Sequence, residues 1–188
     1  TSTILDPTSG LIEPRLMLRR TGIDNLAWDA TQADVERALA QRLGAGERRG
    51  FVECDGPCPS REISWAGSLG PEVSALTVGF LNERFTDFWA NSEFLSTGAG
   101  EQVELATPEG VRVGSSRAEV LAAYPNATLR CFDATTPAGF EPISPWIEFD
   151  TYTFFFDRAG DRVESINGWG LGGAPPSRPT LPICFFPD

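Results

Sequence analysis

The stretch TPEGVRVGSSRAEVLAAYP, residues 107–125, places a glycine-containing turn directly in front of a short amphipathic segment. Ser116 is a good N-cap, and Glu119 three residues later completes a capping box. Pro125 blocks any further helix. The spacing therefore predicts a short helix, and its predicted buried face consists of Val120, Leu121 and Tyr124.

Backbone N–H groups at the start of a helix can also bind an anion, so the turn from Gly110 to Ser116 has a second interpretation. The chain has no lysine for a P-loop and no G-x-G-x-x-G motif. Ser116 and Glu119 already occupy the helix start as caps. Helix initiation is therefore the preferred interpretation.

The same arrangement occurs earlier, in NLAWDATQADVERALAQRLG at residues 25–44. Thr31 and Asp34 form the capping pair, and the two helix starts are offset by 85 residues. A strand-like segment, LTVGF at 76–80, matches YTFFF at 152–156 with an offset of 76 residues. Each half thus contains a helix followed by three strands, which predicts a tandem duplication.

Alternating apolar residues predict three strands in each half. The predicted strands are 61–67, 73–81, 84–90, 128–133, 146–157 and 162–170. The predicted organisation is an N-terminal arm at 1–20, repeat units at 21–98 and 99–170, and a proline-rich tail at 171–188.

Each half resembles the SmpA/OmlA-like domain. The matching pattern is a turn containing Gly or Asp, a Ser/Thr cap, two intervening residues, Asp/Glu-Val, and a short helix closed by Gly or Pro. Val163 and Ile166 fit the V-x-x-I ending of the hairpin that follows, as do Phe85 and Phe88 in the first half. The first half departs from the pattern at its turn glycine, where it has Asp29.

Two such units in tandem, with cysteines after each helix, are similar to the β-lactamase inhibitory proteins over roughly residues 21–170. The resemblance implies an α+β fold, with short helices packed on one face of an antiparallel sheet in each unit. It also implies a non-enzymatic, protein-binding role. Inhibition of a β-lactamase does not transfer, because the target-contacting residues cannot be matched to positions in this chain.

The composition restricts catalysis. The chain contains no histidine, and all 15 basic residues are arginine. It therefore lacks the usual general base near neutral pH, the commonest metal ligand and the amine of Schiff-base chemistry. We expect no enzyme activity and no cofactor.

A net charge of −11 disfavours binding to nucleic acid or to an anionic membrane, since both require a basic face. No apolar run approaches the roughly 20 residues that a membrane-spanning helix needs. We expect a soluble monomer that binds another protein.

The four cysteines predict disulfides. They are Cys54, Cys58, Cys131 and Cys184. A Cys54–Cys58 ring with a Cys131–Cys184 bridge is preferred among the three possible connectivities. A zinc site is the alternative, but it usually needs two tight C-x-x-C pairs. Disulfides indicate an oxidising compartment, so we expect a secreted or cell-envelope protein, and a lipid anchor on an upstream residue is an alternative.

Two groups of carboxylates offer alternative chemistry. Glu148 and Asp150 are two apart on one predicted strand, roughly 6.5–7 Å from each other, a separation that glycosidases use. A solvated strand explains them more simply. The acidic residues around Gly160 lack calcium-loop spacing, and a hairpin turn explains them. These are Asp157, Asp161 and Glu164.

Aromatic residues are the strongest functional indication. In the second half, Tyr152, Phe154 and Phe156 share the predicted core face. The alternate positions Ile147, Phe149 and Phe155 are then expected on the other face, which helices do not cover. Such an apolar face usually marks an interaction site, unless the tail covers it. The predicted partner-binding residues are Trp89, Trp146, Phe149, Phe155 and Trp169.

The sequence thus predicts an exported, non-catalytic binding module. The alternatives are an envelope-assembly or structural lipoprotein component, and a hydrolase that uses Glu148 and Asp150. A lipobox cysteine upstream of Thr1 would favour the envelope role, and a plain leader would favour secretion.

Overall fold

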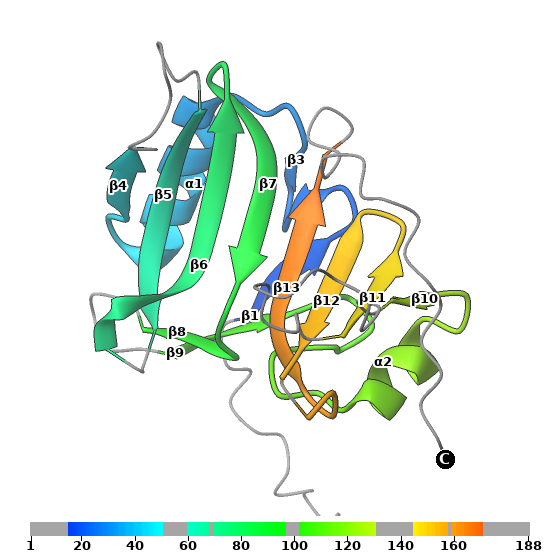
Figure 1. Ribbon diagram of the computed structural model, residues 1–188. Helices are drawn as coiled ribbons and strands as arrows, with labels where there is room; N and C mark the ends of the chain where they lie inside the picture. The colour runs from blue at the N-terminus through cyan, green and yellow to red at the C-terminus, as the bar shows by residue number, and fades with distance from the viewer. Residues whose placement is uncertain are drawn as a thin grey trace, which may run out of the picture.

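A computed structural model describes residues 15–50, 60–67, 70–96, 102–130, 145–157 and 159–170. Within these residues the chain forms thirteen strands and two helices (Figure 1). The helices are α1 (Gln32–Leu43) and α2 (Arg117–Ala123). The strands are β1 (Arg15–Arg19), β2 (Gly22–Ile23), β3 (Leu26–Ala27), β4 (Glu47–Gly50), β5 (Ser60–Gly67), β6 (Gly70–Leu81), β7 (Arg84–Ala90), β8 (Phe94–Ser96), β9 (Gln102–Ala106), β10 (Thr128–Arg130), β11 (Trp146–Phe149), β12 (Tyr152–Phe156) and β13 (Val163–Trp169).

The strands form one hydrogen-bonded path in the order β10-β11-β12-β13-β7-β6-β5-β8-β9-β1-β2-β3, with β4 paired to β5. The front layer in Figure 1 runs from β11 to β5, and β1 lies behind it. The β1–β9 pair is parallel, whereas its neighbours in the path pair antiparallel. The sheet therefore curls back on itself and encloses the core between two layers.

The strands of the front layer follow the predicted pattern closely. The expected segments 61–67, 73–81 and 84–90 correspond to β5, β6 and β7. Asn82 and Glu83 join β6 to β7 with φ of 50° and 62°. A two-residue turn with both central residues at positive φ matches the twist of a hairpin. The predicted hairpin is confirmed.

Both helices begin at their predicted caps. The Thr31 hydroxyl accepts a hydrogen bond from Asp34 N–H, and Ser116 with Glu119 forms a full capping box. Helix α1 buries Val35, Leu39 and Leu43, so it packs with the periodicity expected of an amphipathic helix.

The predicted buried face of α2 includes one residue that is exposed. Val120 and Tyr124 are buried, but the Leu121 side chain is 37% exposed. A seven-residue helix makes only two turns, so its buried face is narrow.

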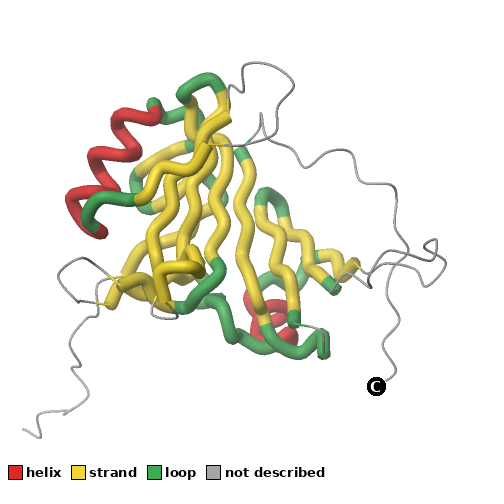
Figure 2. Tube along the Cα trace, turned by 60° about the vertical axis from the view of Figure 1, so that its left-hand side comes forward, coloured by secondary structure: helices red, strands yellow, loops and turns green. Residues whose placement is uncertain are grey.

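The predicted α+β fold, with helices packed on one face of a sheet, is wrong. The structure is predominantly β, and the helices contribute only twelve and seven residues. In Figure 2 the helices lie at the margins of a protein built mainly of strands. The prediction missed the short strands β1, β2, β3, β8 and β9, which form most of the second layer.

Strand β1 supplies part of the cover expected from the helices. It comes from residues 15–19, which the sequence places in the arm, and Leu16 and Leu18 are fully buried. The Tyr152 hydroxyl on β12 donates a 2.6 Å hydrogen bond to the Leu18 carbonyl. Strand β1 therefore packs across the inner face of the front layer.

The two helix starts make equivalent backbone contacts. Asp29 N–H donates to the Phe85 carbonyl, as Gly114 N–H donates to Val163, each at 2.8–2.9 Å. Asp29 and Gly114 have φ of 71° and 88°. Aspartate tolerates this left-handed conformation better than most residues, which explains how it replaces glycine in the first half.

The pairing registers also repeat across the β7–β13 junction. Leu76–Phe80 of β6 pairs with β7 in the same way as Tyr152–Phe156 of β12 pairs with β13, including one bulge at the same position. These are the two segments that the sequence relates by an offset of 76 residues.

Candidate functional site

The candidate site lies on the face of the front layer that is turned away from the core, called here the outer face. Thr77, Trp89, Asn167 and Thr153 lie directly opposite one another on β6, β7, β13 and β12. The adjacent row, Val78, Phe88, Gly168 and Tyr152, belongs to the inner face. Because side chains alternate between the two faces of a strand, the first row belongs to the outer face.

Trp89 is the most exposed aromatic residue on the outer face. Its side chain is 43% exposed, which is the highest value among the large hydrophobic residues that the structure describes. Its ring lies 6.2 Å from that of Trp169 on the neighbouring strand, at an interplanar angle of 71°. This edge-to-face geometry is favourable for aromatic pairs and holds both rings in place.

Asp87 lies on the same strand as Trp89 and belongs to the outer face. A bulge places Thr86 and Asp87 opposite Gly79, and the Thr86 hydroxyl donates a 2.7 Å hydrogen bond to Asp87 Oδ2. A Cβ atom at position 79 would lie 2.3 Å from Asp87 Oδ1, so glycine makes room for the carboxyl group. Burial raises the pKa of Asp87, and the Thr86 hydrogen bond only partly opposes this shift.

Asn167 is only 1% exposed, and its Oδ1 atom has no hydrogen-bond partner among the described residues. The indole Nε1 of Trp169 is likewise buried and unpaired there. Native proteins contain few such atoms, because each loses its hydrogen bonds to water. Two of them beside Trp89 mark this part of the outer face as a candidate binding site.

Three other predicted partner-binding residues lie in different surroundings. Trp146 is only 1% exposed, and its ring packs 6.3 Å from that of half-buried Phe155. Phe149 belongs to the core face with Ile147, because its ring lies 4.7 Å from that of Tyr124, the C-cap residue of α2. The expectation that Ile147 and Phe149 point outward is therefore wrong.

The reason for this error is a turn that the sequence analysis missed. Asp150, with φ of 55°, and Thr151 break the predicted strand 146–157 into β11 and β12. The chain reverses there, so alternation counted from Tyr152 back to Phe149 fails. Of Ile147, Phe149 and Phe155, only Phe155 belongs to the expected face, where it lies opposite Trp146.

The same turn separates Glu148 from Asp150. Glu148 is paired with Arg130 at 3.4 Å, and Asp150 lies in the turn and pairs with Arg20 at 3.2 Å. The expectation that both carboxylates lie side by side on one strand is wrong. Each has its own arginine partner, and the hydrolase hypothesis loses the geometry on which it was based.

The residues around Gly160 form the predicted hairpin turn. Gly160 has φ of 74°, and Asp157 accepts hydrogen bonds from the backbone N–H groups of Asp161 and Arg162. Within the described residues there is no group of three or more side chains suited to hold a metal ion. The four cysteines lie outside the described residues, so their predicted disulfides stay a prediction.

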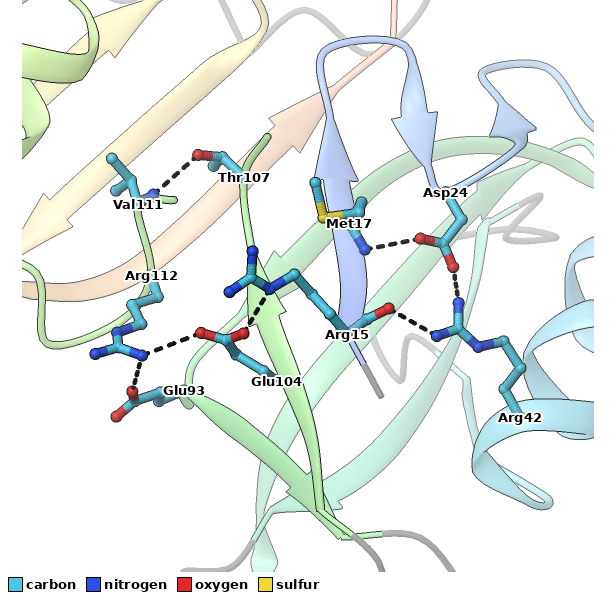
Figure 3. Close-up of polar contacts among 9 residues, drawn as sticks. All are labelled: Arg15, Met17, Asp24, Arg42, Glu93, Glu104, Thr107, Val111 and Arg112. Atoms are coloured by element: carbon cyan, nitrogen blue, oxygen red, sulfur yellow. Dashed lines mark hydrogen bonds and ion pairs between the residues drawn. The ribbon is translucent and has the colours of Figure 1, made fainter. Parts of the chain in front are cut away.

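A second polar cluster surrounds Glu104 (Figure 3). Glu104 on β9 accepts hydrogen bonds from Arg15 at 2.5 Å and Arg112 at 3.0 Å, and Arg112 also pairs with Glu93. Burial alone would raise the pKa of Glu104, but the two arginines outweigh it and lower the pKa overall. Because every charge in this group has an opposite partner, we interpret it as a structural contact.

Figure 3 also shows how β1 is tied to α1. Asp24 accepts a hydrogen bond from the Met17 backbone N–H and pairs with Arg42, which in turn donates to the Arg15 carbonyl. These contacts fix the first strand of the back layer against the helix.

A groove of about 410 Å³ lies between the start of α1 and the β6–β7 turn. It is lined by Gln32, Glu36, Glu83 and Arg84, among others. Gln32 Nε2 donates to Glu36, while its Oε1 atom is buried without a partner among the described residues.

None of the described helices is long and apolar enough to cross a membrane.

No known protein family matches the sequence, and none of the curated proteins matches it. Among solved structures, the chain is similar to the uncharacterized protein yfeY from Escherichia coli, with a TM-score of 0.46 and 11% identity. The similarity covers 82% of this chain and 99% of that one. This degree of similarity carries no argument about function.

Proposed function

We propose that this chain is an exported, non-catalytic binding module that recognises another protein through the outer face around Trp89. The observation that carries the proposal is the 43% exposure of Trp89 beside Trp169 at the centre of the sheet. Tryptophan is enriched in the residues that dominate binding energy at protein interfaces. A rigid β-sheet holds such a residue in one place without a large loss of entropy on binding.

The composition supports the non-catalytic part of the proposal. The chain has neither histidine nor lysine, and the candidate carboxylate pair is separated by a turn. The export part depends on the four cysteines and is tested by locating the protein in cell fractions.

The binding face is tested by placing a photo-crosslinking amino acid at position 89. Position 121 on α2 is the matched control, because Leu121 is also exposed, at 37%, but belongs to a different surface. We expect a discrete crosslinked protein from position 89 that is absent from position 121. Trp169→Ala should reduce its yield without lowering the melting temperature by more than a few degrees. Equal crosslinking from both positions would contradict the proposal.

A further inference from the structure

The residues around Trp89 are arranged so that several of them can contact the same ligand side chain. Asp87 and Trp89 are two apart on β7, while Asn167 and Trp169 lie opposite them on β13. Residues two apart on a strand lie roughly 6.5–7 Å from each other and point the same way. One ligand side chain can therefore reach the Trp89 ring and the Asp87 carboxylate together.

Asp87 has a neutral hydrogen-bond donor and no cationic partner among the described residues. The donor is the Thr86 hydroxyl, and Asp87 forms no ion pair with any residue that the structure describes. By contrast, Glu148 on the same face is already paired with Arg130. A partly buried carboxylate without a cation favours a positively charged partner.

The other groups of the cluster prefer the same kind of ligand. The face of an indole ring attracts cations, and Trp89 is exposed. Asn167 Oδ1 is an unpaired acceptor, and it needs an N–H donor. It is covered in the free protein, so a ligand reaches it only when a neighbouring side chain changes rotamer, which is common on binding.

Arginine combines these properties. Its guanidinium carries five N–H donors, no acceptor, a permanent positive charge and a flat surface that stacks on aromatic rings. The net charge of −11 would also draw a basic protein toward the chain.

We propose that the outer face binds an arginine side chain of a basic protein partner, stacked on Trp89 and paired with Asp87. This inference rests on the proposed function of the face and names the chemistry of its partner. The Trp169 indole N–H is buried in the free protein, so the same side-chain movement would let it donate a hydrogen bond to a main-chain carbonyl of the partner.

The test is a titration of the full chain with a hexa-arginine peptide, followed by NMR of the tryptophan indole N–H signals. A hexacitrulline peptide is the probe without charge. We expect hexa-arginine to shift the Trp89 and Trp169 signals in a saturable way, while hexacitrulline leaves them unchanged. Equal shifts with both peptides would overturn the proposal.

Substitutions locate the binding. Asp87→Asn should weaken hexa-arginine binding roughly tenfold, since it removes a charge-assisted hydrogen bond. Glu83→Gln changes the net charge equally but lies in the β6–β7 turn, so its affinity should stay within about twofold of the wild type. Trp89→Ala should remove the shift of the Trp169 signal. Equal weakening by Asp87→Asn and Glu83→Gln would show only general attraction to a negative protein and overturn the proposal.

Another segment of the chain is excluded as the occupant by adding a soluble paramagnetic agent before the peptide. It should broaden the Trp89 signal, because that ring is exposed. An unaffected signal would show that the face is already occupied, and would overturn the inference.

The two proposals fail in different ways. If crosslinking from position 89 captures a partner and Asp87→Asn does not reduce the yield, the arginine inference fails while the binding face stands. If crosslinking at positions 89 and 121 is the same, the proposed function fails regardless of the peptide results.

Discussion

At the scale of single residues, two carboxyl groups show how environment decides charge. Glu104 lies between two arginines, which lower its pKa despite burial. Asp87 is also partly buried, but its described partner is a neutral hydroxyl group, and its pKa is raised. The first carboxylate therefore stabilises the fold in its charged form, whereas the second destabilises it.

Glu104→Gln should lower the free energy of unfolding at pH 7 by about 1.5–3 kcal/mol, the usual range for hydrogen bonds to charged groups. The folded pKa is lowered, so the stabilisation is fully present above the ordinary value of 4.5 and disappears as the pH falls through the folded pKa. Urea unfolding of both proteins from pH 7 to pH 3 measures this. A difference that stays constant over this range would contradict the assignment.

Asp87→Asn should have the opposite effect and raise the melting temperature at pH 7. The folded pKa lies above the ordinary value of 3.8, so the native state binds its proton more tightly than the unfolded chain. The free energy of unfolding of the wild type therefore falls relative to that of the variant as the pH rises from the ordinary pKa of 3.8 through the folded pKa. The melting temperatures should converge below about pH 3. A variant less stable than the wild type at pH 7 would contradict this prediction. The same substitution is expected to weaken arginine binding. The Asp87 carboxylate would thus lower the stability of the fold while it strengthens binding.

At the scale of elements, the helices depend on their first residues. Ser116 accepts a hydrogen bond from Glu119 N–H, and the Glu119 carboxylate accepts one from Ser116 N–H. The Ser116 N–H and the Ser116 hydroxyl both donate to the Glu119 carboxylate and hold its pKa below the ordinary value. A helix of seven residues would not form alone, so the cap and the buried Val120 and Tyr124 must hold it together.

Ser116→Ala should lower the free energy of unfolding by about 1 kcal/mol, because the helix loses its N-cap. Ser116→Asp is the matched control, since aspartate is also a good N-cap and should retain most of the stability. Urea denaturation measures both changes. Equal losses in the two variants would show that the hydroxyl group acts in some way other than capping.

At the scale of the whole molecule, the fold depends on a short strand that is distant in sequence from the strands that it covers. Leu16 and Leu18 on β1 are fully buried, and the Tyr152 hydroxyl bonds to the Leu18 carbonyl across the core. This contact joins residues separated by 134 positions in the chain. The front layer therefore owes part of its hydrophobic cover to the first described strand.

Leu18→Ala should lower the free energy of unfolding by about 2–5 kcal/mol, the range for removing a buried leucine side chain. Leu121→Ala removes the same atoms from an exposed position on α2 and should change it by less than about 0.5 kcal/mol. Thermal or urea unfolding of the two variants compares them directly. Similar losses would mean that β1 does not close the core.

The local elements of this chain could be predicted because their signals lie within a few residues of one another. The caps at Thr31 and Ser116, the strands β5, β6 and β7, and the β6–β7 hairpin all correspond to the expected positions. The exposed Trp89 could also be identified as an outer-face residue. Asp87 and Asn167 were missed, although a count of two along β7 from Trp89 leads directly to Asp87.

Errors arose where the chain leaves its regular pattern. Asp150 adopts φ of 55° inside an otherwise continuous aromatic run, and this single turn reverses the faces of Phe149 and Ile147. The strands β1, β2, β3, β8 and β9 are two to five residues long, too short for a reliable periodic signal.

The sequence by itself determined where the helices start, how the longer strands alternate, and which catalytic groups the chain lacks. Capping and alternation are local effects, so neighbouring residues are enough to specify them. Only the tertiary structure decided that β1 covers the sheet, and that Asp87, Trp89, Asn167 and Trp169 meet on one face. The reason is that burial and cross-strand pairing depend on residues some eighty or more positions apart, whose contacts exist only once the sheet has closed.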